Sequence, residues 1–539
     1  MISRIVDYSF PEEGNGPYRL FRGIEGSLVE RFEAGLRNPR EAQLGRLEAI
    51  LAEVEGTAFG AAHGLRPGVG LGRFRELVPV RDYDGLREWM ERVHEGKRRV
   101  LTKSPVRSLL KTSGTTGRAK LLPVTETYAR EVREGQSLWR LALIRDHEAV
   151  TRGKALTVVS PAVEGRLPSG LRFGSNTGRM QDEQPWLVRL RYPIPRGVAS
   201  IEDSEARIYA LLRFALQARI STITTANPST VLLLCRKLLE HREDLARDLA
   251  EGTCRYGPAP RLGLAARLRL RVSAVPDDWR PARIWDLATV NCWKGGPARF
   301  FLARLGDALG GEVPIRELGI TASEGYFAIP MSDGDEGGVA WLGGHVLEFV
   351  DEDGPHWAWE LEVGRCYRLV VTTSGGLYRY DLNDLVEVTG FAGGAPLLRF
   401  VRKGRNVLNV TGEKVAEEQV VAVVSRLAPG LEGFTLGVRM GEVPTYVLAV
   451  EGPHEGLGRR LDGALRQANV EYDNKRDTQR LAPAEVLALP PGSYARYRAA
   501  RVAGGAPEGQ VKDLVLAVSE EDWERLMDAA RLPGSGDPG

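Results

Sequence analysis

The sequence predicts an α/β protein with a large N-terminal domain and a small α+β C-terminal domain. The chain has 539 residues, and a domain usually holds about 100–200, so more than one folding unit is expected. Strand and helix patterns alternate through the first half, which indicates a largely parallel sheet. The pattern changes near residues 337 and 400. We therefore expect a large domain over 1–400, a small one over 401–530 and a disordered tail over 531–539.

The first 250 residues contain the periodicities of both helix and strand. Apolar residues that recur every three or four positions indicate a helix with one buried face, and short apolar or β-branched runs indicate strands. In chain order the sequence predicts two helices within 22–53, a β-like stretch over 99–111 that includes 100–101 and 108–110, a Gly/Thr-rich loop over 112–117, a helix over 125–145, a strand over 155–159, a helix over 204–219, a strand over 220–224 and a helix over 229–241. Thr125 or Thr127 is the expected cap of the helix over 125–145.

Short strands separated by Gly/Asp turns are predicted beyond residue 337. They form either a small barrel-like β subdomain or an antiparallel sheet, and a charged, glycine-containing stretch near 400–404 interrupts the pattern. The strands expected here lie within 338–350, 365–373 and 385–388. The C-terminal part then predicts a helix over 413–427, strands over 434–440 and 445–450, a helix over 456–468 and a strand over 485–489.

Composition argues against several classes of protein. The 43% hydrophobic and 27% charged content is ordinary for a globular domain. Because 73 basic residues face 71 acidic ones, the concentrated basic surplus of a nucleic-acid binder is missing. No apolar run approaches the ~18 residues that span a bilayer, and the opening MISRIVDYSFPEEG lacks the apolar core of a signal peptide. We expect a cytoplasmic protein that binds neither nucleic acid nor membrane.

The cysteine pattern supports the same compartment. Cys235, Cys254, Cys292 and Cys366 are far apart and form no CxxC pair, so neither a zinc site nor a disulfide framework is indicated. We therefore expect the four cysteines to be buried free thiols in a reducing cytosol.

The strongest local motif is a Gly/Thr-rich loop, TSGTTGRAK, which runs from Thr112 to Lys120. Small residues let backbone N–H groups approach phosphate oxygens, hydroxyls add donors, and the lysine adds charge. The spacing does not fit a Walker A loop, because no Gly-Lys-Ser/Thr follows the required gap. Only eleven residues of the chain are lysines, so a lysine inside a motif is less easily explained by chance. The alternative is an ordinary strand-to-helix turn.

Two further motifs carry acidic groups. In ITASEG, Ser323 could contact a phosphate and Glu324 a magnesium ion. The motif lacks the first glycine of a GxSxG nucleophile elbow, which argues against a hydrolase. The alternative for Glu324 is a carboxylate at a helix N-terminus. In LYRYDLNDLV, an acid at a strand end could accept both ribose hydroxyls, although Asp381 and Asp384 could equally be turn residues.

Together, in this order, the motifs resemble the acyl-acid amido synthetases known from auxin conjugation in plants, the Gretchen Hagen family of the acyl-adenylate-forming superfamily. The resemblance covers nearly the whole chain. The segments that carry it are TAFGAAHGL, FRELVPVRDYDGLREWM, VLTKSPVRSLLKTSGTTGRAKLLPVT, TTANPSTVLLL, NCWKGGPARFF, ELGITASEGYFAIP, GLYRYDLNDLVEVTGF, FVRKGRNVLNV, TGEKVAEEQV and GQVKD.

The resemblance implies a role for individual residues. It makes Glu324 and Lys512 catalytic, with Glu324 also the Mg²⁺ ligand and Lys512 the residue that reaches the α-phosphate from a mobile C-terminal domain. It places Arg402 at the interdomain hinge. The implied ATP-binding residues are Ser113, Gly114, Thr115, Thr116, Gly117, Lys120, Gly295, Gly296, Thr321, Ala322, Ser323, Asp384, Arg402 and Lys414.

Three residues depart from the family pattern. Ile320 replaces the aromatic residue that stacks on adenine, but it still offers an apolar face. Asp381 and Asn383 replace the Arg and the Gly before Asp384. Because Asn adopts positive φ more readily than most residues, the turn is expected to survive. The added negative charge of Asp381 near a polyanion has no explanation in the sequence.

The resemblance also implies the reaction, its cofactors and its partners. ATP and Mg²⁺ would activate a small carboxylic acid as an acyl-adenylate, and an amine, expected to be an amino acid, would accept the acyl group. Two alternatives stay open: a ligase with a thiol acceptor such as coenzyme A, and a non-catalytic nucleotide-binding or scaffold protein. The sequence identifies neither substrate and does not indicate an oligomeric state.

Overall fold

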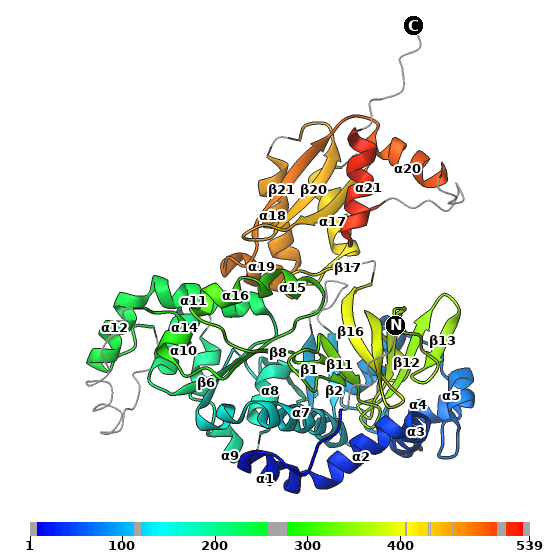
Figure 1. The fold of residues 1–539 in the computed structure, drawn as a ribbon. Helices are drawn as coiled ribbons and strands as arrows, with labels where there is room; N and C mark the ends of the chain where they lie inside the picture. Colours follow the sequence, from blue (N-terminus) through cyan, green and yellow to red (C-terminus); the bar gives the residue numbers. More distant parts are fainter. Residues whose placement is uncertain are drawn as a thin grey trace. The chain divides into compact units, whose positions relative to one another are not determined.

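The structure, a computed structural model, contains two compact units. The described residues up to Arg402 form the first, and those from Lys403 form the second (Figure 1). Among the described helices, none has both the length and the apolar character that crossing a bilayer requires. The predicted fold class, an α/β domain followed by a separate α+β unit, is confirmed. The described residues are 8–112, 120–158, 160–184, 186–201, 203–256, 278–404, 407–429, 431, 433–454, 456–503 and 514–531.

The first unit begins with helices, as predicted for residues 22–53. In chain order they are α1 (Gly16–Ile24), α2 (Gly26–Arg37), α3 (Pro39–Val54), α4 (Ala58–His63), α5 (Leu71–Leu77), the 3₁₀ turn η1 (Asp84–Leu86) and α6 (Arg87–His94). Asn15 caps α1 by accepting from Tyr18 N at 2.9 Å. Pro39 opens α3, where its missing N–H leaves nothing unsatisfied. The apolar faces of α2 and α3 enter the main core.

A small sheet and a long helix follow. β1 (Ser108–Thr112) and β2 (Lys120–Val124) pair antiparallel in a sheet of order β2-β1-β5-β4, which also holds β4 (Gly165–Arg166) and β5 (Arg172–Gly174). Helix α7 (Glu126–Asp146) is capped by Thr125, whose Oγ1 accepts from Tyr128 N at 3.1 Å, as predicted.

The prediction of a strand at 100–101 is wrong. The carbonyl oxygens of Arg99 and Val100 accept from Ala58 N and Phe59 N, both at 2.9 Å, at the first turn of α4. The backbone there satisfies free N–H groups of a helix start instead of a strand neighbour.

A four-stranded parallel sheet of order β3-β6-β7-β8 forms the centre of the α/β part. Its strands are β3 (Lys154–Thr157), β6 (Ile220–Thr224), β7 (Thr289–Asn291) and β8 (Ile315–Arg316). Leu156, Ile223 and Val290 are neighbours across the strands and share a buried core with α10 (Ser204–Leu216) and α11 (Pro228–Glu240), which Figure 1 draws in green. The other elements of this part are η2 (Glu148–Arg152), α8 (Asn176–Asp182), α9 (Trp186–Arg189), η3 (Arg196–Ser200), α12 (Arg242–Glu251), α14 (Pro281–Ile284), η4 (Gly296–Ala298), α15 (Arg299–Leu302) and α16 (Leu305–Leu309).

The strands between residues 320 and 403 form one eight-stranded sheet, so of the two predicted arrangements the antiparallel sheet is the one observed. Its order is β13-β12-β14-β15-β16-β11-β10-β9. The strands are β9 (Ile320–Ala322), β10 (Gly325–Ile329), β11 (Gly337–Ala340), β12 (Val346–Asp351), β13 (Gly354–Trp357), β14 (Cys366–Thr372), β15 (Tyr380–Ala392) and β16 (Ala395–Lys403).

The second unit is a small α+β fold. β19 (Phe434–Arg439) and β20 (Thr445–Glu451) pair antiparallel, and β21 (Ala482–Leu489) joins β20 in parallel. The helix predicted over 413–427 begins only at Glu417, because residues 415–416 form β18 and pair with β17 (Val407–Leu408). The remaining elements are β18 (Val415–Ala416), α17 (Glu417–Leu427), α18 (Leu457–Ala468), α19 (Val470–Asp477), α20 (Ser493–Ala503) and α21 (Glu520–Arg531).

Candidate functional site

The predicted phosphate loop connects two antiparallel strands. Residues 113–117, which carry its predicted contacts, lie outside the described residues, as does Lys512. The loop follows β1 and precedes β2, whose end residues Thr112 and Lys120 pair directly, so the predicted strand-to-helix placement is wrong. The Lys120 ammonium lies 5.6 Å from the centre of the Tyr83 ring, and Tyr83 Oη accepts from Leu121 N at 3.2 Å.

Ser323 and Glu324 form the two-residue turn of the hairpin between β9 and β10, where Ala322 pairs with Gly325. The alternative of a helix N-terminus is therefore wrong, because Glu324 leads into a strand. Tyr128 of α7 donates from its phenol to the Ser323 carbonyl oxygen. The Glu324 side chain is half-buried, and within the described part of the chain it has no hydrogen-bond or ion-pair partner.

The other predicted residues of this motif lie in β9. Thr321 Oγ1 is 3.4 Å from the carbonyl oxygen of Gly325, and Ala322 closes the strand. Ile320 is only 6% exposed and packs in the main apolar core. Its side chain therefore supports the hairpin from inside.

A buried charged group lies beneath the hairpin. Arg46 of α3 donates to both Glu131 of α7 and Ser374 Oγ. Burial raises the pKa of Glu131 to about 6, although Arg46 opposes this. His345 Nδ1 is 3.8 Å from Glu131 Oε2, and burial lowers the pKa of His345 to about 3. Because a Cβ on Gly325 would lie 2.6 Å from His345 Nε2, only glycine fits there without displacing His345.

Asp384 lies in a bulge of β15. Opposite β14, Arg368 pairs with Leu385 and Val370 with Asp381, so residues 382–384 face a single residue. Asn383 has a φ of 56°, which confirms the expected positive φ. Its N–H donates to Asp381 Oδ1 at 2.9 Å, and Asp381 Oδ2 is 3.1 Å from Arg368 Nε. Nothing in the sequence explained an acidic residue at position 381. In the structure the Asp381 carboxylate closes the bulge, and it forms an ion pair with Arg368 of the neighbouring strand.

Tyr380 links the hairpin to the bulge. Burial raises its pKa well above the usual value, and the negative charges of Glu324, Asp82 and Asp381 raise it further. The pKa of Asp381 is raised by burial and by the charges of Asp82 and Asp384. Since such interactions weaken with distance, Glu324 and Asp381 lie near the same buried phenol, and Asp384 lies near Asp381.

Gly295 and Gly296 lie just beyond the carboxyl end of β7. A Cβ on Gly295 would come 2.9 Å from the Phe400 carbonyl oxygen, and one on Gly296 would come 2.8 Å from that of Val401. Gly296 also has a φ of 57°. The backbone of β16 therefore passes so close that only glycine fits. In open α/β sheets, ligands bind beyond the carboxyl ends of the strands.

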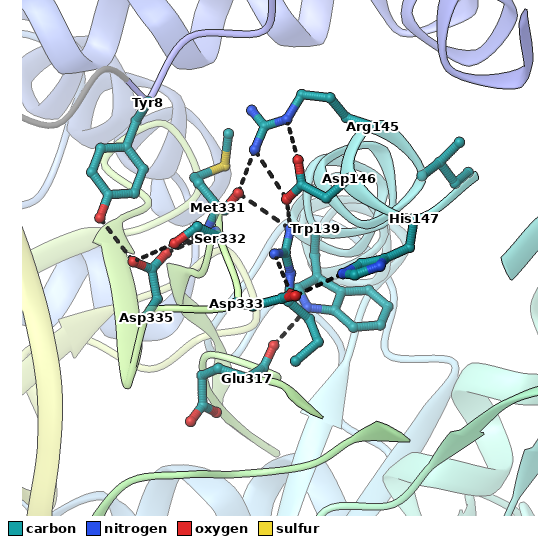
Figure 2. Close-up of polar contacts among 12 residues, drawn as sticks. Tyr8, Trp139, Arg145, Asp146, His147, Glu317, Met331, Ser332, Asp333 and Asp335 are labelled. Carbon is teal, nitrogen blue, oxygen red and sulfur yellow. Dashed lines mark hydrogen bonds and ion pairs between the residues drawn. The ribbon is translucent and has the colours of Figure 1, made fainter. Parts of the chain in front are cut away.

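A buried polar network at the end of β8 was not predicted from the sequence. Arg316 is fully buried and pairs with Asp146 and Asp333, both at 2.9 Å. His147 Nε2 lies 2.7 Å from Asp333 Oδ2, and Figure 2 shows Asp146, His147 and Asp333 of this network. The next residue, Glu317, is 2% exposed. The available signal was an Arg-Glu pair inside the apolar run PIRELGI.

The remaining predicted residues lie at and beyond the division between the units. Arg402 is the last described residue of the first unit and belongs to β16. Lys414 belongs to the second, where it has a φ of 49°. Its N–H donates to Asn409 Oδ1 at 3.3 Å, and its carbonyl accepts from Asn469 Nδ2 at 3.2 Å. The turn that presents Lys414 is thus held by two asparagines.

A parallel sheet, an antiparallel sheet whose β9–β10 hairpin carries Glu324, and a separate α+β unit make up the described part of the chain, and this arrangement has the fold of a solved acyl acid amido synthetase. The models described as GH3 family N-terminal domain, central domain and C-terminal domain match residues 28–315, 329–403 and 415–528. The chain belongs to the GH3 family.

Similar proteins include named amido synthetases. A probable indole-3-acetic acid-amido synthetase GH3.2 of Oryza sativa subsp. japonica is 26% identical over an alignment that covers 86% of each chain. The indole-3-acetic acid-amido synthetase GH3.8 of Oryza sativa subsp. indica is 27% identical over an alignment that also covers 86% of each chain. The solved structure of a GH3.15 acyl acid amido synthetase matches with a TM-score of 0.62 at 21% identity, over 94% of this chain and 96% of that one. This last likeness concerns the fold.

Proposed function

We propose that the protein is an ATP-dependent acyl-acid amido synthetase that adenylates a small carboxylic acid and transfers the acyl group to an amine, with an amino acid as acceptor. The observation that carries the proposal is the Glu324 carboxylate. It stands half-buried at a hairpin turn, close to Tyr380 and the Asp384 bulge, without a partner among the described side chains.

In this proposal the predicted site residues contact different parts of ATP. Ser113, Thr115 and Thr116 donate to the phosphates, and Asp384 accepts from the ribose hydroxyls. Gly295 and Gly296 lie near the adenine, and Lys120, Arg402 and Lys414 supply positive charge. Gly295 and Gly296 follow the carboxyl end of β7, where ligands bind in open α/β sheets, and this position supports an adenine site there.

The residues around Glu324 fit a magnesium ion that arrives with ATP. Mg²⁺ is commonly held by one or two carboxylates together with substrate phosphates. Among the described residues no three His, Cys, Asp or Glu side chains are grouped as a complete metal cage, whereas Glu324 offers a single carboxylate. In this proposal Glu324 would hold the ion, which would offset phosphate charge.

The proposed reaction has two steps. A carboxylate oxygen of the acid attacks the α-phosphorus of ATP, and the bond to pyrophosphate breaks. Lys512 contacts the α-phosphate and stabilises the charge that develops on it. The amine nitrogen then attacks the acyl carbon, loses a proton, and AMP leaves. Because the adenylate is already activated, positioning supplies the rate without a nucleophilic side chain.

We propose that the reaction takes place in the cytoplasm. All four cysteines are free, as is typical of proteins in a reducing compartment. Cys235 and Cys292 are buried as expected, whereas Cys254 is half-buried and Cys366 is exposed, which corrects the expectation of uniformly buried thiols. Burial raises the pKa of Cys235 to about 12, so this thiol is unreactive at neutral pH.

A matrix of carboxylic acids against amino acids, with Mg-ATP, tests the function. Each well is measured for AMP and, by mass spectrometry, for the amide. The expected result is AMP and an amide of the summed mass, less water, for one acid–amine pair. Product formation with coenzyme A and with no amine would contradict the proposed acceptor.

A further inference from the structure

We infer that Glu317 is a positioning residue that holds the two predicted nucleotide-binding segments in a fixed register, and that ATP binding depends on it. The segments are 292–296 after β7 and 317–324 after β8. This inference rests on the proposed function, because it assumes that these segments contact ATP.

One carboxylate connects the backbones of both segments. Glu317 Oε2 accepts from the N–H of Lys294 at 2.6 Å. Glu317 Oε1 accepts from the N–H groups of Leu318 and Gly319 at 2.8 and 3.0 Å. Each oxygen thus serves a different segment: one fixes the residue before Gly295, and the other fixes the turn that leads into β9.

Other contacts make the link rigid. Trp293 Nε1 donates to the Gly319 carbonyl oxygen at 3.1 Å, so an indole joins the same two segments a second time. Gly319 has a φ of 88°, and a Cβ there would lie 2.2 Å from the Ala328 carbonyl oxygen. Cys292 N donates to the Arg316 carbonyl at 3.0 Å, which continues the pairing of β7 with β8.

The Glu317 backbone is held from the opposite side. Trp139 of α7 donates from Nε1 to the Glu317 carbonyl oxygen at 2.8 Å, as Figure 2 shows. Arg316 is fixed by its two aspartates. Tyr326 Oη donates to the Leu318 carbonyl oxygen at 2.6 Å, and Lys294 Nζ donates to that of Asp333 at 2.5 Å. If one segment moves relative to the other, the carboxylate therefore cannot keep its hydrogen bonds to both.

The charge of Glu317 responds to pH near neutrality. Burial raises its pKa to about 7, against the lowering effect of the three N–H groups and of Lys294. The ionisable groups that interact with it are Lys294, Cys292 and Tyr326, and Arg316 precedes it in the sequence. The pKa values of the Cys292 thiol and the Tyr326 phenol are raised by burial and by Glu317 itself, so neither ionises as Glu317 does near pH 7. In the structure both oxygens of Glu317 accept hydrogen bonds. Protonation turns one oxygen into an O–H donor, so that oxygen no longer accepts from its segment.

Glu317→Gln tests the inference, because an amide has one acceptor oxygen and can serve only one of the two segments. At pH 8 we expect the KM for ATP in acid-dependent pyrophosphate exchange to rise about tenfold, as for the loss of one hydrogen bond to a charged acceptor. The KM for the acid stays within about twofold. At pH 6 the wild-type carboxyl is largely neutral, so the ratio of variant to wild type falls toward one. The titration of ATP cancels in that ratio.

Asp248→Asn is the matched control. Asp248 is a buried carboxylate on α12 that accepts from Arg255 N at 2.7 Å and from two hydroxyls, far along the chain from both segments. It should lower the unfolding midpoint without a change in the KM for ATP. Trp293→Phe removes only the second link and should raise the KM for ATP by a few-fold, which keeps the inference testable if Glu317→Gln does not fold.

The two hypotheses fail differently. If the wild-type enzyme exchanges pyrophosphate but Glu317→Gln, or Trp293→Phe in its place, binds ATP normally at pH 8, this inference alone is overturned. A variant-to-wild-type ratio equal at pH 6 and pH 8 would also overturn it. If the wild-type protein shows no acid-dependent exchange and no stabilisation by Mg-ATP, the proposed function is overturned and the inference with it.

Discussion

The Arg379–Glu348 pair fixes the start of the strand that carries Asp384. Their side chains are 6% and 1% exposed. Arg379 Nε and Nη2 donate to Glu348 Oε1 and Oε2 at 2.8 and 2.9 Å. Arg379 Nη1 donates to the carbonyl oxygens of Arg75 and Val78 at 3.0 and 2.8 Å. Replacing Arg379 by Met keeps much of the side-chain volume and removes all four bonds.

The expected loss in the free energy of unfolding depends on which partners Glu348 keeps in the Arg379→Met variant. Arg75 Nε still lies 2.8 Å from Glu348 Oε2, so the carboxylate keeps one partner. Removing one member of a buried ion pair costs about 3–5 kcal/mol, and the retained arginine puts the loss near 3 kcal/mol. Since native proteins are stable by about 5–15 kcal/mol, this is a large share. Urea unfolding followed by circular dichroism measures it.

An exposed ion pair provides the comparison. Arg219 and Asp286 are 66% and 78% exposed and lie 2.9 Å apart. Arg219→Met should cost less than about 1 kcal/mol, because such pairs are largely solvated. Equal losses in Arg379→Met and Arg219→Met would refute the reasoning that the buried pair fixes this strand.

Four further predictions concern single residues. Asp384→Ala should weaken ATP binding by about 1.5–3 kcal/mol for each lost ribose contact; unchanged affinity by calorimetry would exclude the ribose role. Lys512→Ala should slow adenylate formation by about 10²–10³ and leave transfer from a supplied acyl-adenylate near wild type, whereas equal losses in both steps would contradict a role in the first alone. Asn383→Gly should keep wild-type stability, while Asn383→Val should lose about 1–2 kcal/mol because its φ of 56° disfavours a β-branched residue; similar unfolding midpoints would argue against a strained bulge. Because the folded-state pKa of Glu131 is raised to about 6, stability due to this group is present below pH 4.5 and lost as pH rises through 6. Relative to Glu131→Gln, the wild type should therefore lose about 2 kcal/mol between pH 4.5 and 7, and a pH-independent difference would contradict the raised pKa.

Local chemistry made much of the fold predictable. Thr125 caps α7 because its hydroxyl suits a free helix N–H, and β6 follows from its β-branched run. The failures arose where distant residues decide the backbone. Residues 100–101 look β-like but accept hydrogen bonds from α4, and residues 415–416 extend a helical pattern but pair with β17. In each case a tertiary partner overrode the local preference.

The sequence predicted which residues belong to the site but not their local structure. The order of the motifs identified Glu324 and Asp384, yet the sequence SEG is compatible with both a hairpin turn and the start of a helix. Asp381 made sense only once Arg368 lay beside it on the next strand. Glu317 was not predicted as a site residue. Its carboxylate accepts a hydrogen bond from the backbone N–H of Lys294, and a contact to the backbone leaves no pattern in the sequence.

Exchange of labelled pyrophosphate into ATP tests the central claim most directly. Purified protein with Mg-ATP and its acid, in the absence of any amine, should move label from pyrophosphate into ATP, because adenylation is a reversible first step that needs no acceptor. Omitting the acid should abolish the exchange. Release of ADP and phosphate in place of AMP and pyrophosphate would contradict an acyl-adenylate mechanism.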